Sequence, residues 1–187
     1  MAQKKKDWNG LISGFKASDL VFLDESGCNT DMTRRYAYSL GGSRAVDSAP
    51  LSKPKNTTSL SSIQLDGTLR YTTFSGGTTV ERFKRYLETD LLPHLNGNSV
   101  LIMDNMKSHH AKPVKNLLDS SEIRYIYLPP YSPDLNPIEK LWSKVKAFLR
   151  KFKARTLDAL PNAIQNAFHS VTISDCSGWF RFCGYAL

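Results

Sequence analysis

The segment LVFLDESG at residues 20–27 decides the fold, because four apolar residues run into an acidic pair, a serine and a glycine. A short apolar run bounded by turn-forming residues predicts a buried strand that meets a loop. Residues 99–103 form a second such run, which also stops on an aspartate, Asp104. If the two strands are neighbours in one sheet, Asp24 and Asp104 lie close together at the edge where ligands of such sheets bind.

The rest of the sequence supplies the other elements of such a sheet. Residues 57–65 and 68–75 are rich in Thr, Ile, Tyr and Phe, and the Asp66-Gly67 dipeptide between them predicts a hairpin. Residues 35–40 are a further candidate strand, and residues 123–128 predict the last one. Helices are expected from Thr78 or Thr79 to about residue 93, at 113–119, from Pro137 with Asn136 as its cap, at 157–168 and at 174–182. This order predicts an α/β fold: a mixed sheet of three antiparallel plus two parallel strands, with helices on both faces.

The two aspartates predict a metal site. Unpaired carboxylates so placed would repel each other, and one would be pushed toward protonation unless a cation joined them. Mg²⁺ prefers oxygen ligands, and two such ions ~3.5–4 Å apart can activate an attacking oxygen and stabilise the leaving oxygen at a phosphodiester. A third carboxylate must come from another element. Glu139 follows the proline-rich residues 129–137, whose stiffness would fix its position.

Structural alternatives remain open for these residues. Asn136 and Glu139 have the spacing of a capping box, in which the glutamate only reaches back to the cap amide. Asp104 could equally be a polar strand end. The sequence alone therefore leaves a structural role beside the catalytic one.

Other acidic residues and the histidines compete for the same role. Glu25 adjoins Asp24, but neighbours on a strand face opposite ways, and Glu25 suits the covering layer or solvent better. Asp134 is a fallback third ligand. His109 and His110 have no Cys or His at metal-ligand spacing, which argues against a ligand role.

The positive charge is concentrated directly after Glu139. The net charge is +8, and residues 140–155 hold seven basic residues and no acidic one, which leaves 18 basic against 17 acidic residues elsewhere. Such a stretch predicts contact with a polyanion, although a solvated helix face is the alternative. Candidates for holding a DNA backbone are Lys140, Lys144 and Lys146, with Arg34, Arg35 and Arg44 as further ones.

Composition limits the class of protein. The 187 residues are 41% hydrophobic and 22% charged, as in an ordinary globular protein of one domain or a domain with a small appendage. No apolar run approaches the ~20 residues of a membrane span, and the three cysteines lack the spacing of zinc or redox motifs. We expect buried, reduced thiols and a cytoplasmic protein.

Three motifs together resemble a known family. FLDESG at 22–27, LIMDN at 101–105 and LPPYSPDLNPIEKLW at 128–142 are similar to the acidic motifs of the DDE transposases, specifically the mariner-type superfamily and its bacterial insertion-sequence branch. Thirty-four residues separate Asp104 from Glu139, as in that branch. DMTRRYAYSLGGSRA at 31–45 and WFRFCGY at 179–185 also resemble the family's pattern, so the likeness extends over nearly the whole chain from about residue 20.

The resemblance implies a ribonuclease H-like fold, dependence on Mg²⁺ for which Mn²⁺ can substitute, and strand cleavage and transfer at transposon ends. It places the metal ligands at Asp24, Asp104 and Glu139. The expected organisation is a basic tail or linker at 1–19, a catalytic domain at 20–155 and a helical extension packed on it at 156–187.

Family members usually carry helix-turn-helix domains before the catalytic domain, whereas only about 19 residues precede the first motif in this sequence. Three interpretations stay open: a catalytic half that acts with a separately encoded helix-turn-helix protein, a shortened form of a longer protein, and a domesticated remnant. The expected partners are double-stranded DNA and a second copy of the chain, at the nucleoid of a bacterium. The alternative functions are a domesticated ribonuclease H-like nuclease without strand transfer and a non-catalytic DNA-binding or assembly protein.

Overall fold

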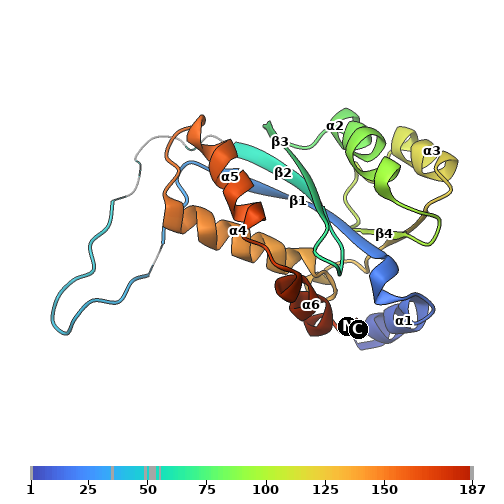
Figure 1. Ribbon diagram of the computed structural model, residues 1–187, viewed down its shortest axis with the longest axis horizontal. Coiled ribbons are helices and arrows are strands. Elements are labelled where there is room, and N and C mark those ends of the chain that lie inside the picture. The colour runs from blue at the N-terminus through green and yellow to red at the C-terminus, as the bar shows by residue number, and fades with distance from the viewer. Residues whose placement is uncertain (1, 35, 49, 51–53, 55, 186–187) are drawn as a thin grey trace.

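The computed structural model describes residues 2–34, 36–48, 50, 54 and 56–185. Its centre is one five-stranded sheet in the order β3-β2-β1-β4-β5 (Figure 1). The first three strands along the chain are antiparallel, and β4 and β5 run parallel to β1. The strands span, in chain order, Leu20–Asn29, Asn56–Ile63, Leu69–Ser75, Val100–Met103 and Arg124–Tyr127. The predicted mixed sheet of three antiparallel and two parallel strands is confirmed.

The β2–β3 hairpin forms where the Asp66-Gly67 dipeptide predicted it. Ile63 pairs with Leu69 at the end of the ladder, and the amide of Gln64 donates to the carbonyl of Thr68 at 3.0 Å. Gly67 has a φ of +89°, a conformation that only glycine adopts without strain. Local turn chemistry therefore sets the register of this half of the sheet.

β1 is longer than its apolar run predicted. Pairing with β2 continues beyond Asp24, from Asp24 opposite Ser61 to Asn29 opposite Asn56. Asp24 thus lies inside a strand and not at its end, because the antiparallel neighbour supplies hydrogen bonds for several residues more. The parallel pairing with β4, in contrast, stops at Leu23 opposite Met103.

The candidate strand at residues 35–40 is wrong for the part that the structure describes. Arg35 lies outside the described residues, and residues 36–40 are not in a strand. Tyr36, Tyr38 and Leu40 are almost fully exposed on the long connection from β1 to β2, which extends away from the sheet (Figure 1). Residues of strand-forming type stay irregular there because no neighbouring strand pairs with them.

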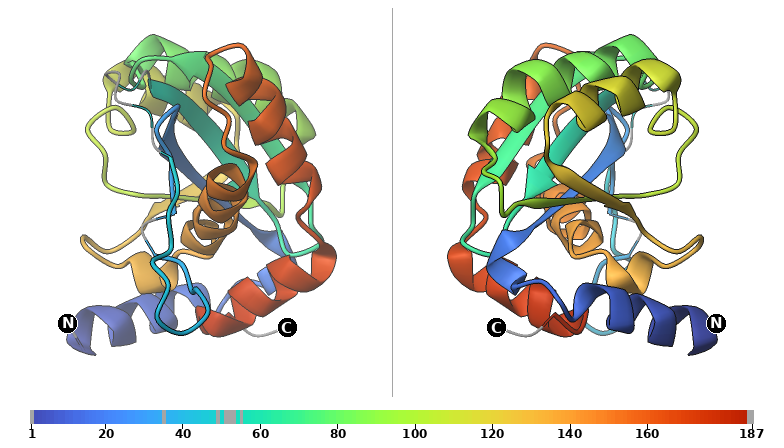
Figure 2. Two further views of the ribbon diagram at one scale, coloured as in Figure 1. Left: turned by 90° about the vertical axis from the view of Figure 1, so that its left-hand side faces the viewer. Right: turned by 90° about the vertical axis from the view of Figure 1, so that its right-hand side faces the viewer.

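Helices cover both faces of the sheet (Figure 2). α2 and α3 pack with Val21, Leu23 and Leu101 on one face, whereas α1, α4, α5 and α6 pack with Phe22 and Ile102 on the other. The α-helices span Ala2–Ile12, Val80–Tyr86, Lys112–Ser120, Ile138–Phe152, Ala159–His169 and Ile173–Phe182 in order, with short helical turns at Ala17–Asp19, Leu87–Leu91, Leu92–His94 and Pro133–Leu135. All predicted helices are present, and the Thr79 side chain caps α2 by accepting from the amide of Arg82.

Helix α1 was not predicted and falls in residues 1–19, where the sequence indicated a basic tail or linker. Trp8 is 3% exposed and belongs to the core, and its Nε1 donates to the hydroxyl of Tyr185 at 3.2 Å. This contact fastens α1 to the segment that follows α6. Among the described residues, every helix is too short or too polar to span a bilayer. Cys28, Cys176 and Cys183 are buried free thiols, as expected.

Candidate active site

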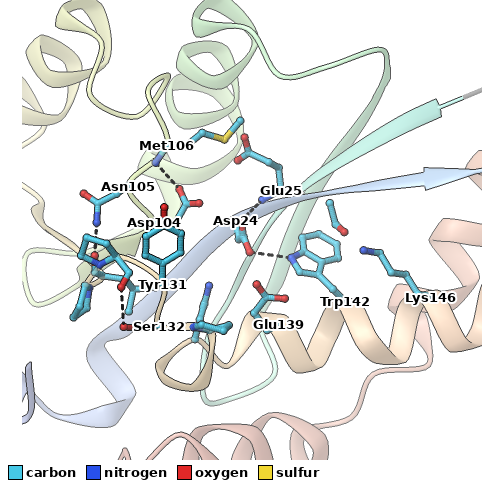
Figure 3. A pocket seen from close by; sticks show the side chains of 16 residues that line it. Asp24, Glu25, Asp104, Asn105, Met106, Tyr131, Ser132, Glu139, Trp142 and Lys146 are labelled. Atoms are coloured by element: carbon cyan, nitrogen blue, oxygen red, sulfur yellow. Dashed lines mark hydrogen bonds between the residues drawn. The ribbon is translucent and has the colours of Figure 1, made fainter. Parts of the chain in front are cut away.

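The end of the β1–β4 ladder brings the first two predicted ligands together. Leu23 and Met103 are its last partners, so Asp24 and Asp104 are the next residues on two adjacent parallel strands. Both line a cavity of about 740 Å³, as does Glu139 from the first turn of α4 (Figure 3). Three carboxylates that are far apart in sequence therefore face one pocket.

Glu139 does not act as the helix cap that its spacing with Asn136 allowed. Helix α4 begins at Ile138, its cap position is Pro137, and no side chain makes a capping hydrogen bond there. The predicted Asn136 cap is wrong: Pro137 occupies the cap position, and the buried Asn136 Oδ1 has no hydrogen-bond partner among the described residues. The Glu139 side chain is exposed toward the pocket.

Asp24 is the most buried of the three carboxylates, with 8% of its surface exposed. Its Oδ1 accepts from the Glu25 amide at 2.7 Å, and its Oδ2 accepts from Nε1 of Trp142 at 3.3 Å. Burial raises the pKa of Asp24 to about 7, and the negative charges of Asp104 and Glu139 add to the rise. The charged form of Asp24 is thus costly unless a cation is near.

Asp104 has the opposite electrostatic environment because His109 lies against it. The Nδ1 of His109 is 2.8 Å from Oδ1 of Asp104, which also accepts from the Met106 amide at 3.0 Å. Burial alone would raise the pKa of Asp104, but the hydrogen bond and charge of His109 outweigh it and hold this pKa below its usual range. One pocket therefore contains a carboxyl that resists ionisation and another that favours it.

His109 is fully buried between two carboxylates. Its Nε2 is 3.2 Å from Oε2 of Glu25, and its ring stacks on Phe83 with centroids 4.1 Å apart. Burial lowers the pKa of His109, but hydrogen bonds to Asp104 and Glu25 more than compensate and raise it to about 9. His109 is thus a buried donor that fixes Asp104, not a residue with ligand spacing of its own.

Glu25 and Asp24 face opposite sides of β1, as the alternation along a strand requires. Glu25 points toward His109 on the face covered by α2 and α3, whereas Asp24 contacts Trp142 of α4 on the other face. Glu25 nevertheless lines the same cavity as Asp24, so the choice of Asp24 as the ligand stays a prediction. Asp134, the fallback ligand, is exposed in the turn Pro133–Leu135 and is not among the residues that line the cavity.

Two residues that hold the carboxylates were missed as site residues by sequence reasoning. Trp142 was quoted as part of a motif, and His109 was set aside for lack of ligand spacing. The available signal was position, since Trp142 lies one helical turn after Glu139 and His109 lies five residues after Asp104. Position in the sequence alone does not show that Trp142 contacts Asp24 or that His109 contacts Asp104.

The predicted DNA-contacting residues are spread over different places. Lys146 lines the cavity, Lys140 lies over the Phe182 ring at 3.8 Å, and Lys144 pairs with Asp175 of α6 at 2.5 Å. Arg34 and Arg44 are exposed on the long β1–β2 connection, and neither lines the cavity. Arg35 is outside the described residues.

The pocket fits a divalent cation in its donor chemistry. The candidate ligands are all oxygens, and the amide Oδ1 of Asn136, buried in the same lining, has no hydrogen-bond partner among the described residues. No group of three His, Cys, Asp or Glu side chains in the described ranges is gathered closely enough to hold a metal ion as it stands. The three carboxylates nevertheless line one pocket, and Mg²⁺ typically completes one or two protein carboxylates with substrate oxygens and water.

Fold and site together define a ribonuclease H-like protein with an acidic centre at the ends of its parallel strands. The chain belongs to the family described as DDE superfamily endonuclease, whose sequence profile matches residues 19–161. The family expected from the three motifs is confirmed; the bacterial branch stays a prediction.

Individual relatives are more distant. The Tc1 transposase of Caenorhabditis elegans is 28% identical over 97 residues, which are 50% of this chain and 36% of that protein. The pre-cleavage Mos1 transpososome has a TM-score of 0.80 at 19% sequence identity, and the similar region covers 97% of this chain and 58% of the Mos1 chain. The catalytic domain of the Mos1 mariner transposase has a TM-score of 0.65 at 16% identity, over 96% of this chain and 85% of its own. The expected fold is thereby confirmed, and the chain spans only part of the full-length relatives.

Proposed function

We propose that this chain is the catalytic domain of a cut-and-paste DNA transposase. The observation that carries the proposal is the meeting of Asp24, Asp104 and Glu139 in one pocket of a DDE-family fold. The Tc1 relative is named a transposase, and the Mos1 neighbours are transposase assemblies. Cleavage followed by joining of DNA strands is the function that agrees with both.

In this mechanism Asp24, Asp104 and Glu139 would hold Mg²⁺, or Mn²⁺ in its place. Mos1 complexes with Mg and with Mn are among the similar structures. When bound, the metal lowers the pKa of an attacking water or hydroxyl and neutralises charge on the phosphate. The chain's own residues orient the site: Trp142 holds Asp24, and His109 holds Asp104 in its ionised form.

The proposed reaction has two steps, hydrolysis of a phosphodiester and transfer of the new strand end to a target strand. Water first adds to the phosphorus of a phosphodiester, the bond from phosphorus to the 3′ oxygen breaks, and a 3′-hydroxyl and a 5′-phosphate remain. The new 3′-hydroxyl then attacks a phosphodiester of the target strand, and a target 3′-hydroxyl leaves. Both steps need the same pocket, so the same three carboxylates should serve both.

Binding of duplex DNA is the second part of the proposal. We infer that Lys146 on the cavity wall and Lys140 in the first turn of α4 contact phosphates, whereas the charge of Lys144 is largely compensated by Asp175. Residues 20–155 would act as the catalytic domain and 156–187 as its packed extension. A second copy of the chain and a helix-turn-helix partner would supply assembly and end recognition, at the nucleoid.

A joining assay tests the proposal against a nuclease without strand transfer. A labelled duplex with a free 3′-hydroxyl is incubated with supercoiled plasmid, with and without Mg²⁺ or Mn²⁺, for wild type and Asp104→Asn. We expect metal-dependent nicking and labelled plasmid from wild type alone. Nicking without labelled plasmid would favour the nuclease, and absence of both with either metal would contradict the proposal.

A further inference from the structure

Tyr131 occupies a conformation that the stability of the fold does not explain. The side chain is 94% exposed, and its backbone has a φ of +59°. A bulky residue other than glycine in this region is strained, and such strain persists where the surroundings impose it, often at ligand sites. A large ring on strained backbone that buries almost nothing suggests a contact made with a partner molecule.

The position of Tyr131 is fixed from both sides. Before it, the buried Leu128 bonds to the end of β4, with its amide donating to the Met103 carbonyl at 2.8 Å. After it, the buried Leu135 accepts from the Tyr185 hydroxyl. Prolines at 129, 130 and 133 stiffen the chain between these anchors. The backbone that carries the ring is therefore anchored on both sides and does not form a free loop.

That place is the rim of the catalytic pocket. Tyr131 lines the same cavity as Asp24, Asp104 and Glu139. Figure 3 shows Tyr131 on the side of Asp104, with Trp142 and Lys146 on the opposite side. Of the aromatic residues that line the cavity, Tyr131 is exposed, whereas Trp142 is buried.

We propose that Tyr131 is a stacking platform for one unpaired DNA base beside the phosphate that is cleaved. This inference rests on the proposed function. Because Asp24 is only 8% exposed, a phosphate reaches it more readily from a strand that has left the regular duplex. An aromatic ring stacks on a base of any sequence and so offsets part of the cost of unpairing.

A base fits the surroundings of this ring better than a protein surface does. Hot spots of protein interfaces lie within a larger packed patch. The neighbours of Tyr131 are instead the exposed Pro130 and Pro133 and the polar Ser132, next to a pocket of carboxylates. One isolated face of this size matches one base.

The test uses two duplexes labelled with 2-aminopurine, one with a short mismatched bubble and one fully paired, without divalent metal. We expect wild type to prefer the bubble by about 5-fold or more, the value of one stacked base, and to quench its fluorescence. Tyr131→Ala and Tyr131→Gly should lose both effects while their affinity for paired duplex is unchanged. Tyr131→Phe should retain both, and the glycine variant keeps the left-handed backbone accessible.

Three outcomes would overturn the inference. Bubble preference and quenching that survive in the alanine and glycine variants would show that the ring does not stack on a base. A dimer in wild type that becomes a monomer in these variants, with DNA binding unaltered, would assign the ring to a second copy of the chain. Lack of plasmid nicking by wild type would remove the proposed function itself, whereas normal nicking with an inert Tyr131 would remove only the stacking role.

Discussion

Asp24→Asn should stabilise the metal-free protein while it abolishes activity. The carboxyl is buried beside Asp104 and Glu139, and its pKa is raised from 3.8 to about 7. Below pH ~4 Asp24 is protonated in the folded and the unfolded chain alike. Between pH ~4 and ~7 the unfolded chain ionises first, so rising pH favours unfolding, and above pH ~7 the penalty is constant. An asparagine at this position has no charged form, so it does not carry the free-energy cost of ionising a buried carboxyl.

The size of the effect follows from the structure. Each unit of pKa separation corresponds to about 1.4 kcal/mol, so full ionisation of Asp24 costs about 4 kcal/mol. Asparagine has a single acceptor oxygen, whereas Asp24 accepts from both Glu25 and Trp142. Loss of one of these hydrogen bonds removes about 1 kcal/mol. The net gain at pH 8 is therefore about 2–3 kcal/mol, or roughly 4–12 °C in Tm for a chain of this size.

Thermal and urea unfolding in EDTA at pH 5 and pH 8 would measure the stability difference between Asp24→Asn and wild type. The gain should shrink strongly at pH 5, and added Mg²⁺ should stabilise wild type more than the variant. Asp175→Asn is the matched control, because hydrogen bonds to Lys144 and Thr172 outweigh burial and lower the pKa of Asp175. That variant should be destabilised at pH 8, and less so as the pH falls through the pKa of Asp175 in the folded chain. A metal-free Asp24→Asn protein at pH 8 that is no more stable than wild type would refute the reasoning.

Two further predictions concern residues around Asp24, Asp104 and Glu139. His109→Gln should weaken Mn²⁺ binding roughly 10-fold or more, because Asp104 loses the donor that fixes it. Titration followed by electron paramagnetic resonance measures the Mn²⁺ affinity. An unchanged affinity would mean that His109 has only a structural role. Lys146→Ala should reduce the slope of log K for duplex binding against log salt concentration by about one unit. Lys144→Ala should alter this slope less, and it should reduce the Tm because the ion pair with Asp175 is lost. Equal slope changes in both lysine variants, measured by fluorescence anisotropy, would contradict the assignment.

Features set by local sequence were predictable. The β2–β3 hairpin follows from its Asp66-Gly67 turn, in which Gly67 takes the positive φ, and α4 follows from its start at the end of the proline-rich segment. Asp24, Asp104 and Glu139 could be singled out as candidates because each ends or begins a recognisable pattern. In these cases the information lies within a few residues of the feature itself.

Features set by distant contacts were not predictable. The extension of β1 past Asp24 depends on β2, and the polar helix α1 is fixed through Trp8 by Tyr185, 177 residues away. The role of His109 depends on Glu25, 84 residues away in sequence. A pattern read along the chain contains no statement about such partners, so residues that hold the carboxylates stay hidden until the fold is known.

We propose that Asp24, Asp104 and Glu139 form a metal-dependent centre for DNA cleavage. Nicking of supercoiled plasmid by wild type, Glu139→Gln and Asp134→Asn, with Mg²⁺, Mn²⁺ or EDTA, tests it most directly. Glutamine can replace glutamate in a helix cap but not as an anionic ligand. We expect metal-dependent nicking by wild type and by Asp134→Asn, and loss of nicking in Glu139→Gln at an unchanged Tm. Full activity of Glu139→Gln would contradict it.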